Sequence, residues 1–479
     1  MQLKRAQRRK RVRESLTALS ASLLAATISA QGDVAAAQDH SGSGLASSDN
    51  TFGPGIGYSE LNSALLVYQE AGGRVVAIEP SASLTINGSN GQVFTLGAIF
   101  DAVSGATPNG AVSSNQAQIF STPFKSVGAS TGGGTTTVTS ASGGSTIVRL
   151  PSTAGAVSYG TRQYTVAPNV LPVDKGFSDL REAFNFGWSQ PLGAISQLGF
   201  GGGYSIERDY RAITADVHTS QNFNSDNTTV SLALNTELDS SFPYGGVPTA
   251  FTEMSGVWKT PYSKDKTQLG FVLGVTEVIS RHWLMQLNYS YDTQSGYQND
   301  PYRVISVVNA TSGEPIDYLY ENRPSNRQSQ SLFWNNKFDF GPSVTDLSLR
   351  YFKDSWGITS KTAELSERIA LGSSVYFEPS ARWYQQSAAN FFRNYLVEGQ
   401  ALPTYASSDS RLAAFSSLTY GLKVGFNLTG RTELYFRGGY YQPTGITHPA
   451  GAIGQLAQQD LFGGTNATFA FIGYTWDFH

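Results

Sequence analysis

The sequence has 479 residues and contains no cysteine. This absence excludes disulfide scaffolds, thiolate zinc sites, iron–sulfur clusters and a lipid-modified N-terminal cysteine. Charged residues make up only 14% of the chain, the mean hydropathy is −0.22, and no long apolar run follows residue 30. A protein built from several membrane-spanning helices is therefore excluded. Glycine (50), tyrosine (24) and phenylalanine (27) are abundant instead.

The N-terminus has the basic, apolar and small-residue order of a secretory signal peptide. An apolar stretch over 16–30 and a small-residue site at Ala35-Ala36-Ala37 follow a basic cluster. The members of that cluster are Lys4, Arg5, Arg8, Arg9, Lys10, Arg11 and Arg13. We predict export and cleavage after Ala37, which removes seven basic and two acidic residues and changes the formal charge from −3 to −8. A basic nucleic-acid arm is the alternative, but an acidic body disfavours a nucleic-acid partner.

Strict alternation of apolar and polar residues dominates the rest of the chain. Apolar residues occupy every second position from Trp283 to Tyr291, and again from Leu418 to Phe426. A period of two predicts β-strands with one apolar and one polar face. We count about sixteen such segments, at 61–70, 73–87, 91–104, 177–190, 194–209, 211–222, 227–239, 267–279, 282–294, 327–339, 343–355, 359–370, 374–387, 412–427, 430–442 and 466–478.

The connections between these segments alternate in length, which distinguishes a membrane barrel from a soluble sandwich. Tight turns alternate with mostly longer links, of which 105–176 is the longest and is rich in Gly, Ser and Thr. We therefore predict an all-β, antiparallel, up-and-down transmembrane barrel of about sixteen strands, with short periplasmic turns and long extracellular loops. The predicted organisation is a signal peptide (1–37), a periplasmic segment (38–60) and the barrel (61–479) in the outer membrane of a Gram-negative cell.

Aromatic residues support insertion into a lipid bilayer. Trp188, Trp283, Trp383 and Trp476 suit the aromatic girdles at the two interfaces. At the C-terminus, an alternating apolar series ends in an aromatic residue, and it resembles the signal that the barrel-assembly machinery reads. The residues of this series are Ile472, Tyr474, Trp476 and Phe478.

Four segments carry a family resemblance: DAVSGATPNGA at 101–111, SGYQNDPYRVIS at 295–306, YENRPSNRQSQSLFW at 320–334 and FEPSARWYQQSAA at 377–389. With the strands between them, the chain resembles a bacterial family of unknown function that is grouped with outer-membrane β-barrel proteins. The resemblance implies the fold and the location, and it implies no activity.

The same alternation predicts a charged barrel interior. Acidic and basic residues four positions apart share the polar face of a strand, which is too far for direct contact and favours pairing across strands. The predicted lumen charges are Asp346, Arg350, Glu364, Arg368, Glu378, Arg382, Lys423, Glu433 and Arg437. They could select ions or solutes, or they could form a structural network that fills the lumen.

The leading functional hypothesis is a porin-like channel or transporter for a small solute. The alternatives are a non-conducting structural or docking barrel for a periplasmic or extracellular partner, and an outer-membrane hydrolase. The five histidines form no H-E-x-x-H motif or close pair. The glycine-rich segments 105–110 and 199–203 lack the spacing and the lysine of phosphate loops. We therefore expect no catalytic residue, cofactor or metal.

Overall fold

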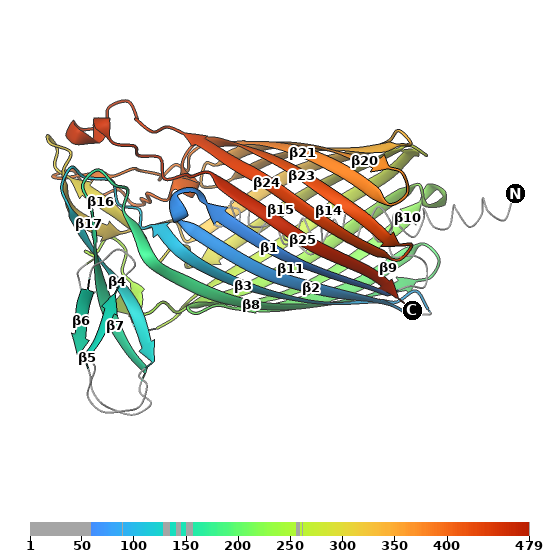
Figure 1. Cartoon of the computed structure of the whole chain (residues 1–479), viewed down its shortest axis with the longest axis horizontal. Helices are drawn as coiled ribbons and strands as arrows, with labels where there is room; N and C mark the ends of the chain where they lie inside the picture. The colour runs from blue at the N-terminus through green and yellow to red at the C-terminus, as the bar shows by residue number, and fades with distance from the viewer. Residues whose placement is uncertain are drawn as a thin grey trace, which may run out of the picture.

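The computed structural model describes residues 59–88, 90–127, 135–139, 145–149, 157–254, 259–260 and 262–478. Sixteen antiparallel strands form one closed barrel, and Figure 1 shows them steeply tilted around a common axis. The predicted all-β barrel fold of about sixteen strands is confirmed. The predicted signal peptide, its cleavage site at Ala37 and most of the predicted segment 38–60 lie outside the described residues.

The barrel strands follow the sequence in ring order, interrupted only by strands within the long loops. They are β1 (Ser59–Glu70), β2 (Val75–Asn87), β3 (Val93–Pro108), β8 (Val173–Leu192), β9 (Ser196–Ile206), β10 (Tyr210–Phe223), β11 (Thr228–Ser241), β14 (Lys264–Ser280), β15 (Trp283–Gly296), β18 (Asn326–Asp339), β19 (Ser343–Asp354), β20 (Thr359–Leu371), β21 (Val375–Gln386), β23 (Phe415–Thr429), β24 (Thr432–Gly445) and β25 (Ala467–Phe478). β3 and β8 each extend four residues further into the predicted 105–176 link, which therefore shortens to 109–172.

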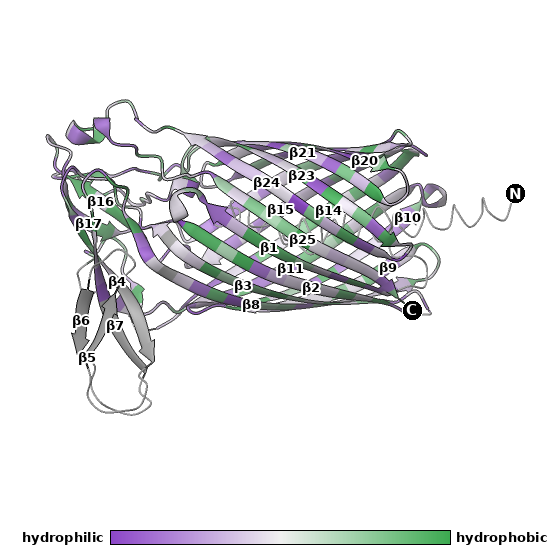
Figure 2. Ribbon diagram, in the orientation of Figure 1, coloured by the Kyte–Doolittle hydropathy of each residue, from purple (hydrophilic) through white to green (hydrophobic). Residues whose placement is uncertain are grey.

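The alternation of residue types matches the alternation of exposure along the strands. On β15, Leu287 and Tyr289 are exposed, whereas Asn288 and Ser290 are buried. Large exposed apolar side chains of this kind surround the barrel, and polar side chains face the interior. Figure 2 shows the resulting bands of hydrophobic and hydrophilic residues along the strands. Because every strand has one apolar and one polar face, a closed ring places the apolar face outside without a second protein layer.

The last strand closes the ring against the first. Twelve residue pairs join β25 to β1, from Ser59 opposite Phe478 to Glu70 opposite Ala467. Closure leaves no edge strand with unpaired backbone groups in the barrel. The chain therefore begins and ends its barrel at the same end.

All the barrel connections longer than five residues lie at one end of the barrel. At the end that holds the last barrel residue, which we call the short-turn end, the connections are 88–92, 193–195, 224–227, 281–282, 340–342, 372–374 and 430–431. The opposite, long-loop end carries 71–74, 109–172, 207–209, 242–263, 297–325, 355–358, 387–414 and 446–466. Figure 1 shows the long loops gathered at this end, with the β4–β7 hairpin (Gln118–Val127 and Val157–Val166) projecting sideways.

The long loops contain further secondary structure. β5 (Thr135–Thr139) pairs with β6 (Ser145–Arg149), and β12 (Val247–Pro248) pairs with β13 (Lys259–Thr260). A three-stranded sheet combines β16 (Val304–Val308), β17 (Pro315–Tyr320) and β22 (Leu396–Val397) from two different loops. Among the described residues, no helix is long and apolar enough to cross a membrane.

The loops meet above the mouth of the barrel. The Val304 amide donates to the Asn109 carbonyl oxygen at 2.8 Å, although these loops leave β3 and β15, which five strands separate on one side and nine on the other. The backbone N–H of Gln455 donates to the Ser312 carbonyl oxygen at 2.9 Å. This bond joins the loops after β24 and β15, which are also separated by five strands on one side and nine on the other. Loops from nearly opposite sides of the rim thus form one folded unit across the mouth, which we call the cap.

Candidate functional site

The nine predicted lumen charges occupy the polar, inward face of β19 to β24. Arg350 is typical, because its neighbours Leu349 and Tyr351 are exposed on the outer face. The register brings Glu364 opposite Arg382 on the next strand. It also sets Glu378, Lys423 and Arg437 in one row across β21, β23 and β24. The sequence pattern placed these residues on one face, but only the register of the strands decides which of them meet.

Three of these residues take part in two ion pairs between strands. Lys337 on β18 binds Asp346 on β19, with Nζ 3.0 Å from a carboxylate oxygen. Arg368 on β20 reaches Glu433 on β24, with 3.8 Å between nitrogen and oxygen, and passes over two intervening strands to do so. Pairing therefore occurs between strands, as the spacing of four positions along each strand requires.

An aromatic ring supports the longer of these two pairs. The Tyr376 ring lies against Gly425, where an added Cβ would stand 2.0 Å from the Tyr376 Cε1 atom. The Arg368 guanidinium stacks 3.6 Å from the centre of this ring, and the Tyr376 hydroxyl donates to Glu433 at 2.6 Å. One tyrosine therefore positions both the base and the acid. Tyr376 was not predicted as a site residue. Alternation shows only which way its side chain faces, whereas its role depends on Gly425, which lies beside it on the next strand.

Other cations on this wall also rest on rings. Lys423 Nζ lies 4.4 Å from the centre of the Tyr435 ring, and that ring covers Gly473. The Arg350 guanidinium lies 5.7 Å from Phe333, and that of Arg437 lies 6.0 Å from Phe471. Cation–π contact at these separations is attractive, so the rings hold the basic side chains along the wall.

A buried network of charges holds the cap together. Its centre is Asp409, whose carboxylate lies 2.7 Å from Arg411, 2.9 Å from Arg323 and 3.5 Å from Arg303. Arg323 also binds Glu321 at 2.7 Å. Burial would raise the pKa of Asp409, but the three guanidinium groups outweigh burial and hold it well below the usual value. The network joins loop 297–325 to loop 387–414.

The cap also packs on the inner face of the barrel. Leu412 from loop 387–414 packs with Phe352, Trp356 and Phe391 in one buried apolar cluster. The side-chain amide of Gln386 on β21 donates to the carbonyl oxygens of Arg411 and Ala413 at 2.9 and 2.7 Å. These contacts draw the loop inward across the mouth.

The network residues were not predicted as a site. Asp300, Arg303, Glu321 and Arg323 occur within the segments that carry the family resemblance. The charged residues inside these two short loop segments could have indicated a charged site in the loops. Which of them would meet depends on loop folding, and a sequence pattern does not show that.

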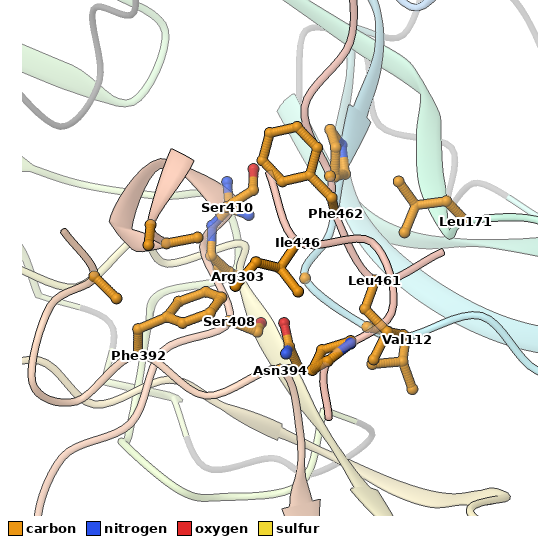
Figure 3. A pocket seen from close by; sticks show the side chains of 18 residues that line it. Val112, Leu171, Arg303, Phe392, Asn394, Ser408, Ser410, Ile446, Leu461 and Phe462 are labelled. Carbon is orange, nitrogen blue, oxygen red and sulfur yellow. The ribbon is translucent and has the colours of Figure 1, made fainter. Parts of the chain in front are cut away.

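A pocket of about 190 Å³ lies within the cap. Figure 3 shows Val112, Phe392, Ile446, Leu461 and Phe462 around it, with Arg303, Ser408 and Ser410 on one side. Four loops contribute residues to this lining. Because Asp300 and Asp409 both lie 3.5 Å from Arg303, the arginine adds little net charge, and the pocket is mainly apolar.

The predicted girdle and C-terminal residues face outward. Trp188, Trp283 and Trp476 lie near the short-turn end of their strands, and Trp383 lies near the long-loop end of β21. Trp283 donates its indole N–H to Asn336 at 3.0 Å. Ile472, Tyr474 and Trp476 are exposed, and the Phe478 ring lies 4.9 Å from that of Trp476.

Several solved structures resemble the chain at low sequence identity. A mutant of the ferric enterobactin receptor from Pseudomonas aeruginosa is 14% identical with a TM-score of 0.38, and the match covers 84% of this chain and 57% of the receptor. A bacterial polysaccharide outer membrane secretin is 7% identical with a TM-score of 0.43, covering 88% and 99% of the two chains. CdiB from Acinetobacter baumannii is 8% identical with a TM-score of 0.42, covering 87% and 60%.

The chain thus spans a little over half of the enterobactin receptor. A search of curated proteins found no match to the chain. A family model described as "Protein of unknown function (DUF3570)" matches residues 19–476, and so this closed barrel with its charged inner wall and folded cap belongs to the DUF3570 family.

Proposed function

We propose that this protein is an outer-membrane β-barrel that carries a small solute across the outer membrane of a Gram-negative cell. The observation that carries the proposal is a closed ring of sixteen strands with apolar side chains exposed outside and polar and charged side chains inside. Barrels of 16 to 18 strands are wide enough to enclose an aqueous channel. The apolar outer face suits acyl chains, since a spanning sheet must pair all its backbone groups.

The location requires export and insertion. Residues 1–37 would direct export and be removed after Ala37, and the barrel-assembly machinery would recognise the outward series that ends at Trp476 and Phe478. The girdle tryptophans would lie at the two membrane interfaces. The lumen charges of β19 to β24 would attract or repel the solute without reacting with it, so the proposed activity is transport without catalysis.

Conductance in planar bilayers tests the transport proposal. Purified protein should produce discrete current steps, whose size increases when the cap network is broken by Asp409→Asn. Heat-modifiable migration on SDS gels should accompany these steps, because a closed barrel resists unfolding in detergent. A barrel that migrates in this way and yet passes no current, with or without an intact cap, would refute transport.

A non-conducting docking barrel is the second candidate, and the cap favours it. Loops from nearly opposite sides of the rim meet over the mouth and share a buried ionic network, which would suit a surface that presents loops to a partner. Purification from solubilised outer membranes separates the two proposals. A stoichiometric partner without conductance supports docking, whereas conductance without a partner supports transport.

A further inference from the structure

The inner wall across the ring from β21 has a strip of glycines. Glycines occupy three successive inward-facing positions on β9, and one inward-facing position each on β3 and β8. The members of the strip are Gly97, Gly187, Gly199, Gly201 and Gly203. An added Cβ at Gly201 would stand 2.1 Å from a carboxylate oxygen of Asp216, and one at Gly199 would stand 2.1 Å from Nε2 of His218. The Asp216 and His218 side chains therefore lie over the glycines of β9, and we call this stretch of β8, β9 and β10 the glycine groove.

The glycine groove is the accessible part of this wall. The Asp216 and His218 side chains are 29% and 25% exposed, and Asn185 on β8 is exposed as well. On β15, by contrast, the inward Asn288 and Asp292 are each 2% exposed. A solute in the lumen can therefore reach Asp216 more readily than the acid on β15.

Acidic side chains stand at the long-loop end of the glycine groove. Asp179, Glu207 and Asp209 each place one carboxylate oxygen within 4.8 Å of the others. Burial raises the pKa of Asp209, which accepts a hydrogen bond from the Tyr302 hydroxyl. Asp216 continues this acidic series further into the barrel.

Each of the nearby bases lies beside an acid or an aromatic ring. Arg181 lies opposite Asp101 in the pairing of β3 with β8, and the Arg208 guanidinium stacks 4.9 Å from the Tyr244 ring. His218 contacts Asp216, with 3.0 Å between Nδ1 and the carboxylate. The basic residues of the barrel interior are concentrated on the other side of the ring, and β21 with its Arg382 is separated from β10 by six strands on one side and eight on the other.

We propose that small, positively charged solutes move along the glycine groove, attracted by the acids at its long-loop end and in contact with Asp216. This inference rests on the proposed transport function and names its substrate class. Carboxylates lining a pore favour cations. Because the Asp216 side chain is 29% exposed, a hydrated ammonium or guanidinium group in the lumen can reach its carboxylate.

Thiol labelling tests the glycine groove without requiring conductance, because the native chain has no cysteine. Ser205→Cys places one thiol on the inward face of β9, and Ser366→Cys places a matched thiol on the inward face of β20. Each variant is treated separately with a positively and a negatively charged methanethiosulfonate of similar size. We expect the ratio of cationic to anionic reaction rates to be about three- to fivefold higher at 205 than at 366. Adding Glu207→Gln, two positions from the thiol, to Ser205→Cys should reduce this difference.

Ion selectivity provides the second readout. In a KCl gradient the wild-type protein should prefer K⁺ over Cl⁻, and Asp216→Asn should reduce this permeability ratio about threefold. Glu277→Gln is the control, because it removes an acid from the outward face of β14 and should leave the ratio unchanged. Gly201→Leu should lower cation conductance by displacing the Asp216 carboxylate that lies over Gly201, whereas Gly438→Leu, on an outward glycine of β24, should not.

The two readouts separate the proposals. The cation path would be overturned by equal labelling ratios at 205 and 366, or by a faster reaction of the anionic reagent at 205. It would also be overturned by an unchanged ratio of K⁺ to Cl⁻ permeability in Asp216→Asn. Absence of current from every variant would refute transport, and the labelling ratios would then still decide whether the glycine groove attracts cations.

Discussion

The barrel and the cap are stabilised in different ways. The barrel is held by backbone ladders around a closed ring, and many of its large apolar side chains, such as Leu269 at 56% exposure, contact no other protein layer. The cap has short strands and depends on buried side chains, with Leu412 and Asp409 both at 0% exposure. The barrel should therefore tolerate side-chain substitution over most of its outer surface, whereas single changes should disrupt the cap.

Asp409→Asn should produce the largest effect. Three arginines would lose the carboxylate that they share, and removing one partner of a buried ionic network costs about 3–5 kcal/mol. Hydrogen exchange should accelerate in loops 297–325 and 387–414 while the barrel strands keep their protection. Asp265→Asn, at an exposed carboxylate on β14, is the control. Unchanged protection of both loops in Asp409→Asn would show that the network does not hold the cap.

A pair of leucine truncations compares the two regions directly. Leu412→Ala removes a fully buried side chain from the cluster with Trp356, which costs roughly 2–5 kcal/mol. Leu269→Ala removes an outward side chain and should leave the fold of the barrel and the cap unchanged. Protease cleavage within 387–414 should increase only in Leu412→Ala. Equal cleavage of both variants would remove the distinction between barrel and cap.

Gly425→Ala tests the part of the barrel that does depend on side-chain fit. The new methyl group would displace the Tyr376 ring, and overpacking of this kind costs about 1–3 kcal/mol. The Arg368–Glu433 pair should lose its support, so channel conductance should change while the cap stays protected. Gly438→Ala, where the nearest heavy atom is 3.9 Å away, is the matched control. An identical conductance in Gly425→Ala and wild type would show that the ring is dispensable.

The smallest effect is expected from mild acid. Because the folded-state pKa of Asp409 is held well below its usual value, its contribution to cap stability is fully present above the unfolded pKa of about 3.9 and is lost only as pH falls through the lower, folded value. Hydrogen exchange of loop 387–414, corrected for the intrinsic pH dependence, should not change between pH 7 and pH 5. Loosening near pH 6 would mean that another group controls the cap, such as Glu321, whose pKa is raised by burial.

The barrel was predictable because its determinants are local. The alternation along Trp283–Tyr291 predicts a strand with one apolar and one polar face, whatever its neighbours are. The alternation of short and long connections indicates the up-and-down order of the strands. The positions of the nine lumen charges on the inward face follow from the same period. The partners of Arg368 and Asp346 did not follow from it, since a strand register is set by pairing with a neighbour.

The cap was not predictable from periodicity. Its loops have no repeating pattern, and Asp409 lies about 85 to 105 positions from Arg323 and Arg303 in the chain, so only folding brings these charges together. The cluster around Leu412 likewise combines β19 with loop 387–414. The glycine groove lies between these two cases. The run at 199–203 was visible in the sequence, but its meaning depends on which side chains of β8 and β10 lie across it.

The sequence by itself determined the strand period, the number of barrel strands and the side of each strand that faces inward, because each of these depends on residues one or two positions apart. Only the tertiary structure decided which charges pair, where the wall is open and how the mouth is covered. These features depend on strand register and loop packing, which bring together residues that are distant in the chain, and their energies arise from contacts that no local pattern encodes.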